Sequence, residues 1–203
     1  MPFVSLINAG YRYPGTDRWV FRRFDMAIEP GEVIRVTGRN GTGKSTLLKV
    51  LGGILEPTEG KLCNQSDAKI AYMDQFSGEM LARDLTIAEQ FKAATARGAL
   101  LRTDPIEMLT QFELGLQYRL EEFIGHLSGG QRQIIALLCT LAAGASILCL
   151  DEFTSSMDEY SVQVADKLLA HAKAVANVAL IVVSHSGIAT KPDRELEVST
   201  HRR

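Results

Sequence analysis

The sequence predicts an α/β fold with a mainly parallel sheet that is covered by helices. From Ser128 onward, segments with helical periodicity alternate with short apolar segments, an order typical of parallel sheets whose strands are connected by helices. A further strand and helix, separated by a glycine-rich loop, occupy residues 32–51. With 203 residues and 46% apolar composition, the chain is long enough to bury the core of one such domain.

The chain begins with predicted strands, continues with predicted helices, and then alternates between the two. Apolar and β-branched residues predict strands at residues 3–8, 19–28, 32–37, 69–73, 147–150 and 178–184. Helical spacing predicts helices at residues 44–51, 128–142 and 159–174, and residues 57–60 are predicted to form a turn. Apolar residues also recur at helical intervals across residues 86–117, which predicts a small helical subdomain.

These elements predict a single domain, residues 1–203, with two parts. The core would comprise about residues 1–75 and 144–203, and the helical subdomain about residues 76–143. One stretch, residues 134–150, carries no charge and resembles a membrane span in composition. It runs directly into Asp151 and Glu152, which a bilayer disfavours, so we interpret it as a buried helix end followed by a buried strand.

Composition excludes several kinds of partner and location. Charged residues make up 23% of the chain and give a net charge of −2, so no overall positive field attracts nucleic acid, and no nucleic-acid partner is expected. The three cysteines, Cys63, Cys139 and Cys149, form no CxxC pair, and the N-terminus lacks the pattern of a secretory signal. A cytoplasmic location with reduced thiols is therefore expected.

A glycine-rich loop follows the strand predicted at residues 32–37. Residues 38–45 read GRNGTGKS and match the pattern GxxxxGK[ST] between a strand and a helix. Glycines allow backbone N–H groups to turn toward one anion, and the helix N-terminus adds its positive end. Lys44 is expected to reach the β- and γ-phosphates of a nucleotide, and Ser45 is expected to ligate Mg²⁺.

Two carboxylates follow the strand predicted at residues 147–150. Asp151 is expected to hold the metal, usually through water, and Glu152 to polarise the attacking water as general base or orienting group. Two acids after a strand are, taken alone, more often a helix N-cap pair. The phosphate loop upstream favours the catalytic interpretation.

A second glycine-rich segment settles the family resemblance. Residues 127–131 read LSGGQ and are similar in all five positions to the signature of ABC ATPases. A serine hydroxyl and glycine N–H groups at the start of a helix make another anion site. The resemblance extends from about Phe3 to His185. It implies the ABC ATPase fold, with a P-loop NTPase core, a mainly parallel sheet, an N-terminal antiparallel β subdomain and a small helical subdomain.

The resemblance also implies a head-to-tail dimer that binds ATP and Mg²⁺. In this family, the signature of one subunit closes over the ATP held by the phosphate loop of the other, so two ATP molecules are buried in a two-fold dimer. Complete motifs at both anion sites favour a homodimer over a pair of different ABC ATPase chains. The position after Glu152 is usually proline in the family and is Phe153 here, a change expected to affect loop stiffness more than chemistry.

The resemblance assigns roles to single residues. Gln75 resembles the glutamine that senses Mg²⁺ and the attacking water, and His185 resembles the switch histidine that contacts the γ-phosphate. Tyr13 resembles the aromatic residue that stacks on adenine, although Tyr11 and Trp19 are close enough in sequence to compete. The expected catalytic residues are Glu152, His185 and Gln75, and the expected Mg²⁺ ligands are Ser45, Gln75 and Asp151. The expected ATP contacts are Tyr13, Gly38, Asn40, Gly41, Gly43, Lys44, Ser45 and Thr46 and, from the opposite subunit, Ser128, Gly129, Gly130, Gln131 and Asp158.

The function implied by the resemblance is the ATP-hydrolysing subunit of an ABC transporter. Its transmembrane permease subunits would be separate chains, docked near Gln75, and the protein would sit peripherally on the inner face of the cell membrane. The alternative is a soluble ABC ATPase that assembles or remodels a cytosolic complex, as in the iron–sulfur assembly branch. DNA-repair and translation relatives carry a long coiled coil or two such domains, and neither feature occurs in this chain.

Overall fold

The computed structural model describes residues 2–64, 67–96, 104–112, 115–183 and 190–199. Its strands are β1 (Val4–Tyr11), β2 (Phe21–Ile28), β3 (Val33–Thr37), β4 (Glu59–Asn64), β5 (Ile70–Asp74), β6 (Ile147–Asp151), β7 (Ala179–Val183) and β8 (Arg194–Glu197). Its α-helices are α1 (Lys44–Leu51), α2 (Ile87–Thr95), α3 (Pro105–Gln111), α4 (Gly129–Ala142) and α5 (Glu159–Ala176). Short 3₁₀ helices are η1 (Ser77–Met80), η2 (Leu116–Tyr118) and η3 (Ile124–His126).

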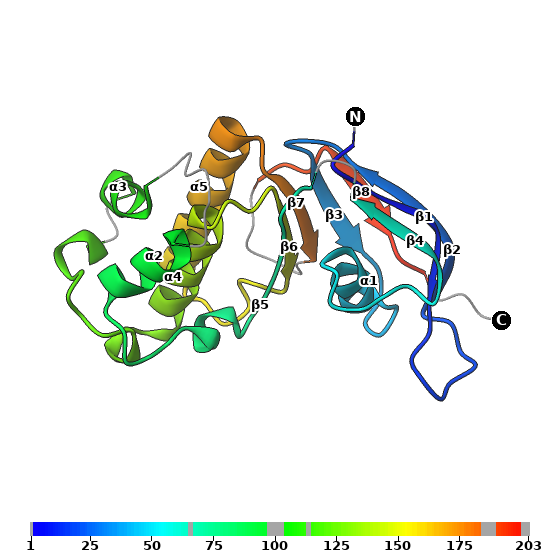
Figure 1. Cartoon of the computed structure of the whole chain (residues 1–203), viewed down its shortest axis with the longest axis horizontal. Helices are drawn as coiled ribbons and strands as arrows, with labels where there is room; N and C mark the ends of the chain where they lie inside the picture. Colours follow the sequence, from blue (N-terminus) through cyan, green and yellow to red (C-terminus); the bar gives the residue numbers. More distant parts are fainter. Residues whose placement is uncertain (1, 65–66, 97–103, 113–114, 184–189, 200–203) are drawn as a thin grey trace.

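Two sheets organise these elements in layers. Five parallel strands form one sheet in the order β5-β6-β7-β3-β8, and three antiparallel strands form the other in the order β2-β1-β4. Helix α1 and the antiparallel sheet lie on one side of the parallel sheet, and α4 and α5 cover the other side (Figure 1). The predicted α/β fold is therefore confirmed, including its mainly parallel sheet and its N-terminal antiparallel strands.

The central strands are apolar throughout because helices or a second sheet cover both of their faces. In β6, Leu148 and Leu150 belong to the core cluster with α4 and α5, whereas Ile147 and Cys149 belong to the cluster with α1 and the antiparallel sheet. All five residues of β6 are buried, as are all five of β7. The uncharged stretch at residues 134–150 is thus the end of α4 followed by β6, as predicted.

Two of the three cysteines lie in the core, as expected from the apolar segments around them. All three are free, and Cys139 and Cys149 are buried. Burial raises the pKa of each of these two thiols to about 12, so both stay protonated at neutral pH.

Two strands were not predicted. Strand β4 pairs with β1 in a region where a turn was expected at residues 57–60, and Gly60 has a φ of 71° inside it. Strand β8 is a short edge strand of mostly exposed polar residues that pairs with β3. Neither segment has the apolar alternation of a half-buried strand, because each pairs along its backbone and buries few side chains.

Helices α2 and α3 pack against α4, and residues of α2, α4 and the edge strand β5 line one groove. Helix α2 begins with a capping box in which Thr86 and Glu89 satisfy each other's backbone N–H groups. Helix α3 begins at Pro105 after the N-cap Asp104. Helices within residues 86–117 were predicted, whereas the division of the chain at residues 76–143 stays a prediction.

Candidate functional site

The loop between β3 and α1 has the backbone of an anion cradle. Gly38, Gly41 and Gly43 have φ values of 140°, 76° and 101°, in the region that favours glycine. A Cβ on Gly43 would lie 2.2 Å from Cγ1 of Val20, and a Cβ on Gly38 would lie 2.4 Å from the backbone oxygen of Val198. All three positions therefore favour glycine by conformation, and Gly38 and Gly43 also by close approach, which fits a loop whose N–H groups surround a phosphate.

Lys44 lies across this loop as the first residue of α1. Its side chain is largely buried, and its Nζ donates hydrogen bonds to the backbone oxygens of Gly38 at 3.0 Å and Arg39 at 3.2 Å. An ammonium group has three donors and no acceptor, so these contacts hold the charge over the loop where phosphate oxygens would compete for it.

A cavity of about 360 Å³ opens at the loop. It is lined by Tyr13, Val20, Asn40, Gly41, Gly43, Lys44, Ser45, Thr46 and Glu152. The structure thus brings together the loop, one predicted catalytic residue and one candidate adenine-binding aromatic. Its size is in the range of small-ligand sites.

Ser45 and Asp151 meet although 106 positions separate them. The Ser45 hydroxyl donates to Oδ1 of Asp151 at 3.0 Å, and Asp151 is 7% exposed at the end of β6. Hydroxyl and carboxylate oxygens are the hard ligands that Mg²⁺ takes, with waters and substrate phosphates completing its shell. Ser45 and Asp151 could therefore supply two oxygens to an ion that arrives with phosphate. Within the described residues no group of three or more His, Cys, Asp or Glu side chains is placed to hold a metal ion.

Tyr72 is a residue of this site that the sequence analysis missed. Its hydroxyl donates to Oδ2 of Asp151 at 2.8 Å. Burial is the main cause that raises the pKa of Tyr72, and the hydrogen bond to Asp151 adds to it, so the phenol keeps its proton at neutral pH. The available signal was a single tyrosine in the otherwise apolar run Ile70–Met73.

Glu152 occupies a strained backbone position at the cavity. Its φ of 50° is in the left-handed region, which a glutamate rarely adopts. The Glu152 N–H donates to the backbone oxygen of Val183 at 2.8 Å, and its own carbonyl accepts from the Ser155 N–H at 2.9 Å. Backbone strain of this kind often occurs at functional sites, and here it accompanies a carboxylate that lines the phosphate-loop cavity.

Gln75 lies just beyond β5 and is held by the segment after Glu152. Ser155 donates its hydroxyl to Oε1 of Gln75 at 2.8 Å, and Ser156 donates to the Gln75 backbone oxygen at 3.1 Å. Gln75 is not among the residues that line the phosphate-loop cavity, so its roles in catalysis and metal binding stay predictions. His185 lies outside the described residues, and its predicted role is likewise untested.

The three competing aromatics have different surroundings. Tyr13 is 45% exposed and lines the phosphate-loop cavity, whereas Tyr11 is 6% exposed and belongs to the core. The Trp19 ring lies 5.2 Å from the guanidinium of Arg12 and 4.5 Å from that of Arg22. Of these aromatics, Tyr13 has the geometry to meet a base whose phosphates lie in the loop.

The signature segment forms the start of α4. The Ser128 hydroxyl oxygen accepts from the Gln131 N–H at 3.2 Å, and Oε1 of Gln131 accepts from the Ser128 N–H at 3.0 Å. This capping box uses a lone pair of Ser128, so the hydroxyl proton is left for donation to an anion. Ser128 and Gly129 are both exposed, as a site for a ligand from another subunit requires.

Asp158 caps the start of α5 next to the signature. Its Oδ1 accepts from the Ser161 N–H at 2.7 Å, and this hydrogen bond holds the pKa of Asp158 below its usual value. A Cβ on Gly130 would lie 2.5 Å from the Ser161 hydroxyl oxygen, so the two helix starts touch. A small cavity of about 90 Å³ between them is lined by Leu116, Ser128, Gln131, Ile134, Asp158, Tyr160, Ser161 and Val164.

The predicted ATP contacts therefore fall into two spatial groups. Of the eight residues expected to contact ATP within one subunit, all but Gly38 line the phosphate-loop cavity. Three of the residues expected to contact it from the opposite subunit, Ser128, Gln131 and Asp158, line the cavity at the signature. The two cavities have no lining residue in common.

The parallel sheet, the phosphate loop between β3 and α1, and the carboxylates at the end of β6 define a phosphate-loop nucleotide-binding protein. More narrowly, the chain belongs to the ABC transporter family, whose model matches residues 21–155.

Individual relatives agree with this membership. The zinc import ATP-binding protein ZnuC of Rhizobium meliloti is 32% identical over 186 residues, which cover 91% of this chain and 59% of that relative. The chain thus spans less than two thirds of that protein's length. The lipoprotein-releasing system ATP-binding protein LolD of Psychrobacter arcticus is 28% identical over 94% of this chain and 92% of its own.

The fold is also that of a solved ABC cassette. A dimeric bacterial ABC transporter cassette superposes with a TM-score of 0.75 and 25% identity, over 96% of this chain and 94% of that one. Among the described residues, no helix has the length and apolar character needed to cross a membrane.

Proposed function

We propose that this chain binds and hydrolyses ATP as a head-to-tail dimer and powers a transporter whose membrane subunits are separate chains. The observation that carries the proposal is the separation of the phosphate-loop residues and the signature residues into two cavities of one chain. Each chain therefore supplies the phosphate-loop half of one site and the signature half of another, and a two-fold dimer completes both sites. A homodimer satisfies this arrangement without a second kind of ATPase chain.

The residues at the phosphate loop support ATP hydrolysis. Lys44 and the loop N–H groups would bind the β- and γ-phosphates, and Tyr13 would stack on adenine. Ser45 and Asp151 would hold Mg²⁺, which neutralises charge on the phosphate oxygens when bound. Glu152 would accept a proton from the water whose oxygen attacks the γ-phosphorus, while the bond to the leaving oxygen of ADP breaks.

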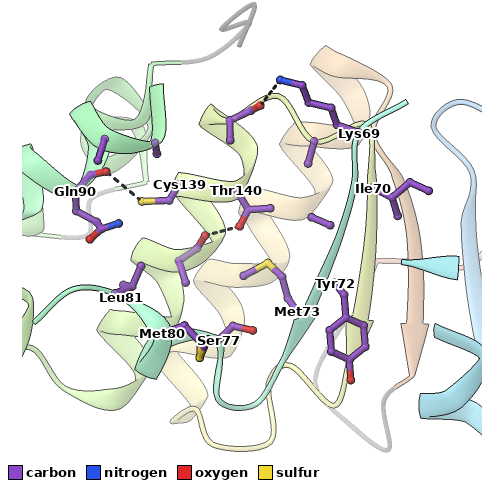
Figure 2. A pocket seen from close by; sticks show the side chains of 16 residues that line it. Lys69, Ile70, Tyr72, Met73, Ser77, Met80, Leu81, Gln90, Cys139 and Thr140 are labelled. Atoms are coloured by element: carbon purple, nitrogen blue, oxygen red, sulfur yellow. Dashed lines mark hydrogen bonds between the residues drawn. The ribbon is translucent and has the colours of Figure 1, made fainter. Parts of the chain in front are cut away.

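The membrane partner would dock in a groove of about 710 Å³ beside β5. Figure 2 shows this groove between strand β5 and helices α2 and α4, with Lys69 at one end and Ser77 and Met80 at the other. Met80, which lines the groove, is 87% exposed, and Phe76, the neighbour of Gln75 in the sequence, is 59% exposed. We propose an apolar helix of a permease subunit as the occupant, since relatives are named as ATP-binding proteins of import and release systems. The protein would then sit on the inner face of the cell membrane.

The test is the molar mass of the Glu152→Gln variant with and without Mg²⁺ and ATP, measured by light scattering after gel filtration. Removal of the carboxylate slows hydrolysis and relieves repulsion near the γ-phosphate, so ATP should convert monomer to dimer. The same variant with Lys44→Ala should stay monomeric because it binds ATP poorly. An ATP-bound monomer of the Glu152→Gln variant would contradict the homodimer.

The transporter role has a separate test. A tagged chain purified from detergent-solubilised membranes should recover integral membrane subunits, and an exchange of Met80 for Glu at the groove should reduce their recovery. Recovery of the chain only in a soluble complex would contradict the transporter role and favour a soluble remodelling ATPase.

A further inference from the structure

We propose that Tyr72 is a positioning residue that fixes the Asp151 carboxylate and, through it, the Ser45 hydroxyl for Mg²⁺. This inference rests on the proposed function, because it concerns the same metal site. It adds a residue from β5 to a site otherwise built from the phosphate loop and β6.

Asp151 receives one donor on each carboxylate oxygen. Ser45 donates to Oδ1 at 3.0 Å and Tyr72 donates to Oδ2 at 2.8 Å. With both oxygens engaged from different elements, the carboxylate cannot rotate about its last bond without losing one of the two hydrogen bonds. Tyr72 therefore helps to fix the plane of the carboxylate, and with it the direction in which a carboxylate oxygen faces Ser45.

The Ser45 hydroxyl proton points toward Asp151 in this arrangement. The lone pairs of the Ser45 oxygen therefore point elsewhere and can face a metal ion. Residues that hydrogen-bond to a metal-ligating side chain orient that side chain and tune its basicity in this way. Tyr72 thus orients Asp151, and Asp151 orients the Ser45 hydroxyl that would ligate Mg²⁺.

The Tyr72 ring is itself held by its neighbours. Strands β5 and β6 pair in parallel with Tyr72 opposite Cys149, two positions before Asp151, so the side chain reaches along the strand to the carboxylate. A Cβ on Gly52 would lie 3.2 Å from Cβ of Tyr72, which brings the end of α1 against this residue. Nζ of Lys49 lies 6.0 Å from the ring centroid. The ring is thus packed independently of its hydroxyl group.

Tyr72→Phe keeps this packing and removes only the donor. The full chain carrying Tyr72→Phe is loaded with a non-hydrolysable ATP analogue, and Mn²⁺ binding is measured by electron paramagnetic resonance of the free ion. We expect nucleotide affinity in EDTA to stay within about twofold of the unchanged chain and the Mn²⁺ dissociation constant to rise about tenfold or more. Tyr118→Phe, at a side chain that is 87% exposed, is the matched control and should change neither quantity.

A double-mutant comparison tests whether the effect runs through Asp151. If it does, Tyr72→Phe should add little to the loss of Mn²⁺ affinity in an Asp151→Asn chain. An unchanged Mn²⁺ dissociation constant in Tyr72→Phe, or a full additional loss in the double variant, would overturn the inference. A parallel loss of nucleotide affinity in EDTA would also overturn it, because that is the sign of a general structural defect.

A different result of the same experiment would contradict the proposed function: the chain without substitutions would bind no nucleotide, or would bind nucleotide without Mn²⁺.

Discussion

Oε1 of Gln133 accepts a hydrogen bond from the backbone N–H of Gly78 at 2.5 Å, 55 positions away in the sequence. The amide nitrogen of the same side chain donates to the backbone oxygens of Asp74 and Phe153. Gln133 is 2% exposed, so one buried amide joins the signature helix α4 to the segments that follow β5 and β6. Those segments carry Gln75 and Glu152, which links the signature physically to the candidate catalytic residues.

Gln133→Leu should strongly destabilise the fold. The change leaves a buried N–H at Gly78 and two carbonyls without their partner, and each unsatisfied buried group costs about 1–3 kcal/mol. Urea unfolding followed by circular dichroism should show a loss of about 3 kcal/mol or more. Gln111→Leu, on an exposed position of α3, is the control and should stay within about 0.5 kcal/mol. Equal stabilities of the two variants would contradict the structural role of Gln133.

Gly78→Ala tests how closely η1 approaches α4. A Cβ at Gly78 would lie 2.7 Å from the backbone nitrogen of Gln133 and 2.9 Å from the backbone carbon of Arg132, and backbone atoms of a helix cannot yield easily. Overpacking of this kind costs about 1–3 kcal/mol, which thermal or urea unfolding would detect. Gly129→Ala places its Cβ in open space and should be neutral or slightly stabilising. A Gly78→Ala chain as stable as the parent would show that η1 can move away from α4.

Tyr13 and Trp19 should differ in their effect on nucleotide affinity. Tyr13→Ala removes the aromatic face at the phosphate-loop cavity, and stacking of a base on an aromatic ring is worth about 1–3 kcal/mol. ATP titration by calorimetry should therefore show a loss of about tenfold for Tyr13→Ala and little change for Tyr13→Phe. Trp19→Ala should leave the affinity close to the parent value. A larger loss for Trp19→Ala would transfer the adenine role to Trp19.

Ser128→Arg should separate dimer closure from nucleotide binding. Ser128 does not line the phosphate-loop cavity of its own chain, so ATP affinity of the monomer should change less than about twofold. The added side chain would occupy the space that the opposite ATP needs, and light scattering of Ser128→Arg in the Glu152→Gln chain should show a monomer with ATP. A dimer that still forms would contradict the role of the signature.

Two outcomes show where inference from the sequence was incomplete. Phe153 was considered only for an effect on loop stiffness rather than chemistry, and the structure adds that its side chain is 1% exposed in the core cluster with α4 and α5 and that its carbonyl accepts from Gln133. Strands β4 and β8 were missed because edge strands that bury few side chains lack an apolar period. In both cases the deciding contacts are with residues distant in the chain.

The phosphate loop, the carboxylates of Asp151 and Glu152 at the end of β6, and the signature were all recognisable in the sequence. Each is a short contiguous segment whose chemistry depends on local backbone conformation, such as the positive φ of Gly38, Gly41 and Gly43, and only certain residue types allow that conformation. The same is true of the parallel α/β fold, because strand and helix periods are local properties.

Other features depended on the three-dimensional fold. Tyr72 and Asp151 are 79 positions apart, and Gln133 and Gly78 are 55 apart, so no local pattern could pair them. Tyr13 was preferred over Tyr11 and Trp19 because it is the one of the three that lines the phosphate-loop cavity. The two anion sites are separate because the start of α4 lies beside the start of α5 and away from the phosphate loop. These relationships arise from packing between layers, which sets distances that the order of residues alone does not contain.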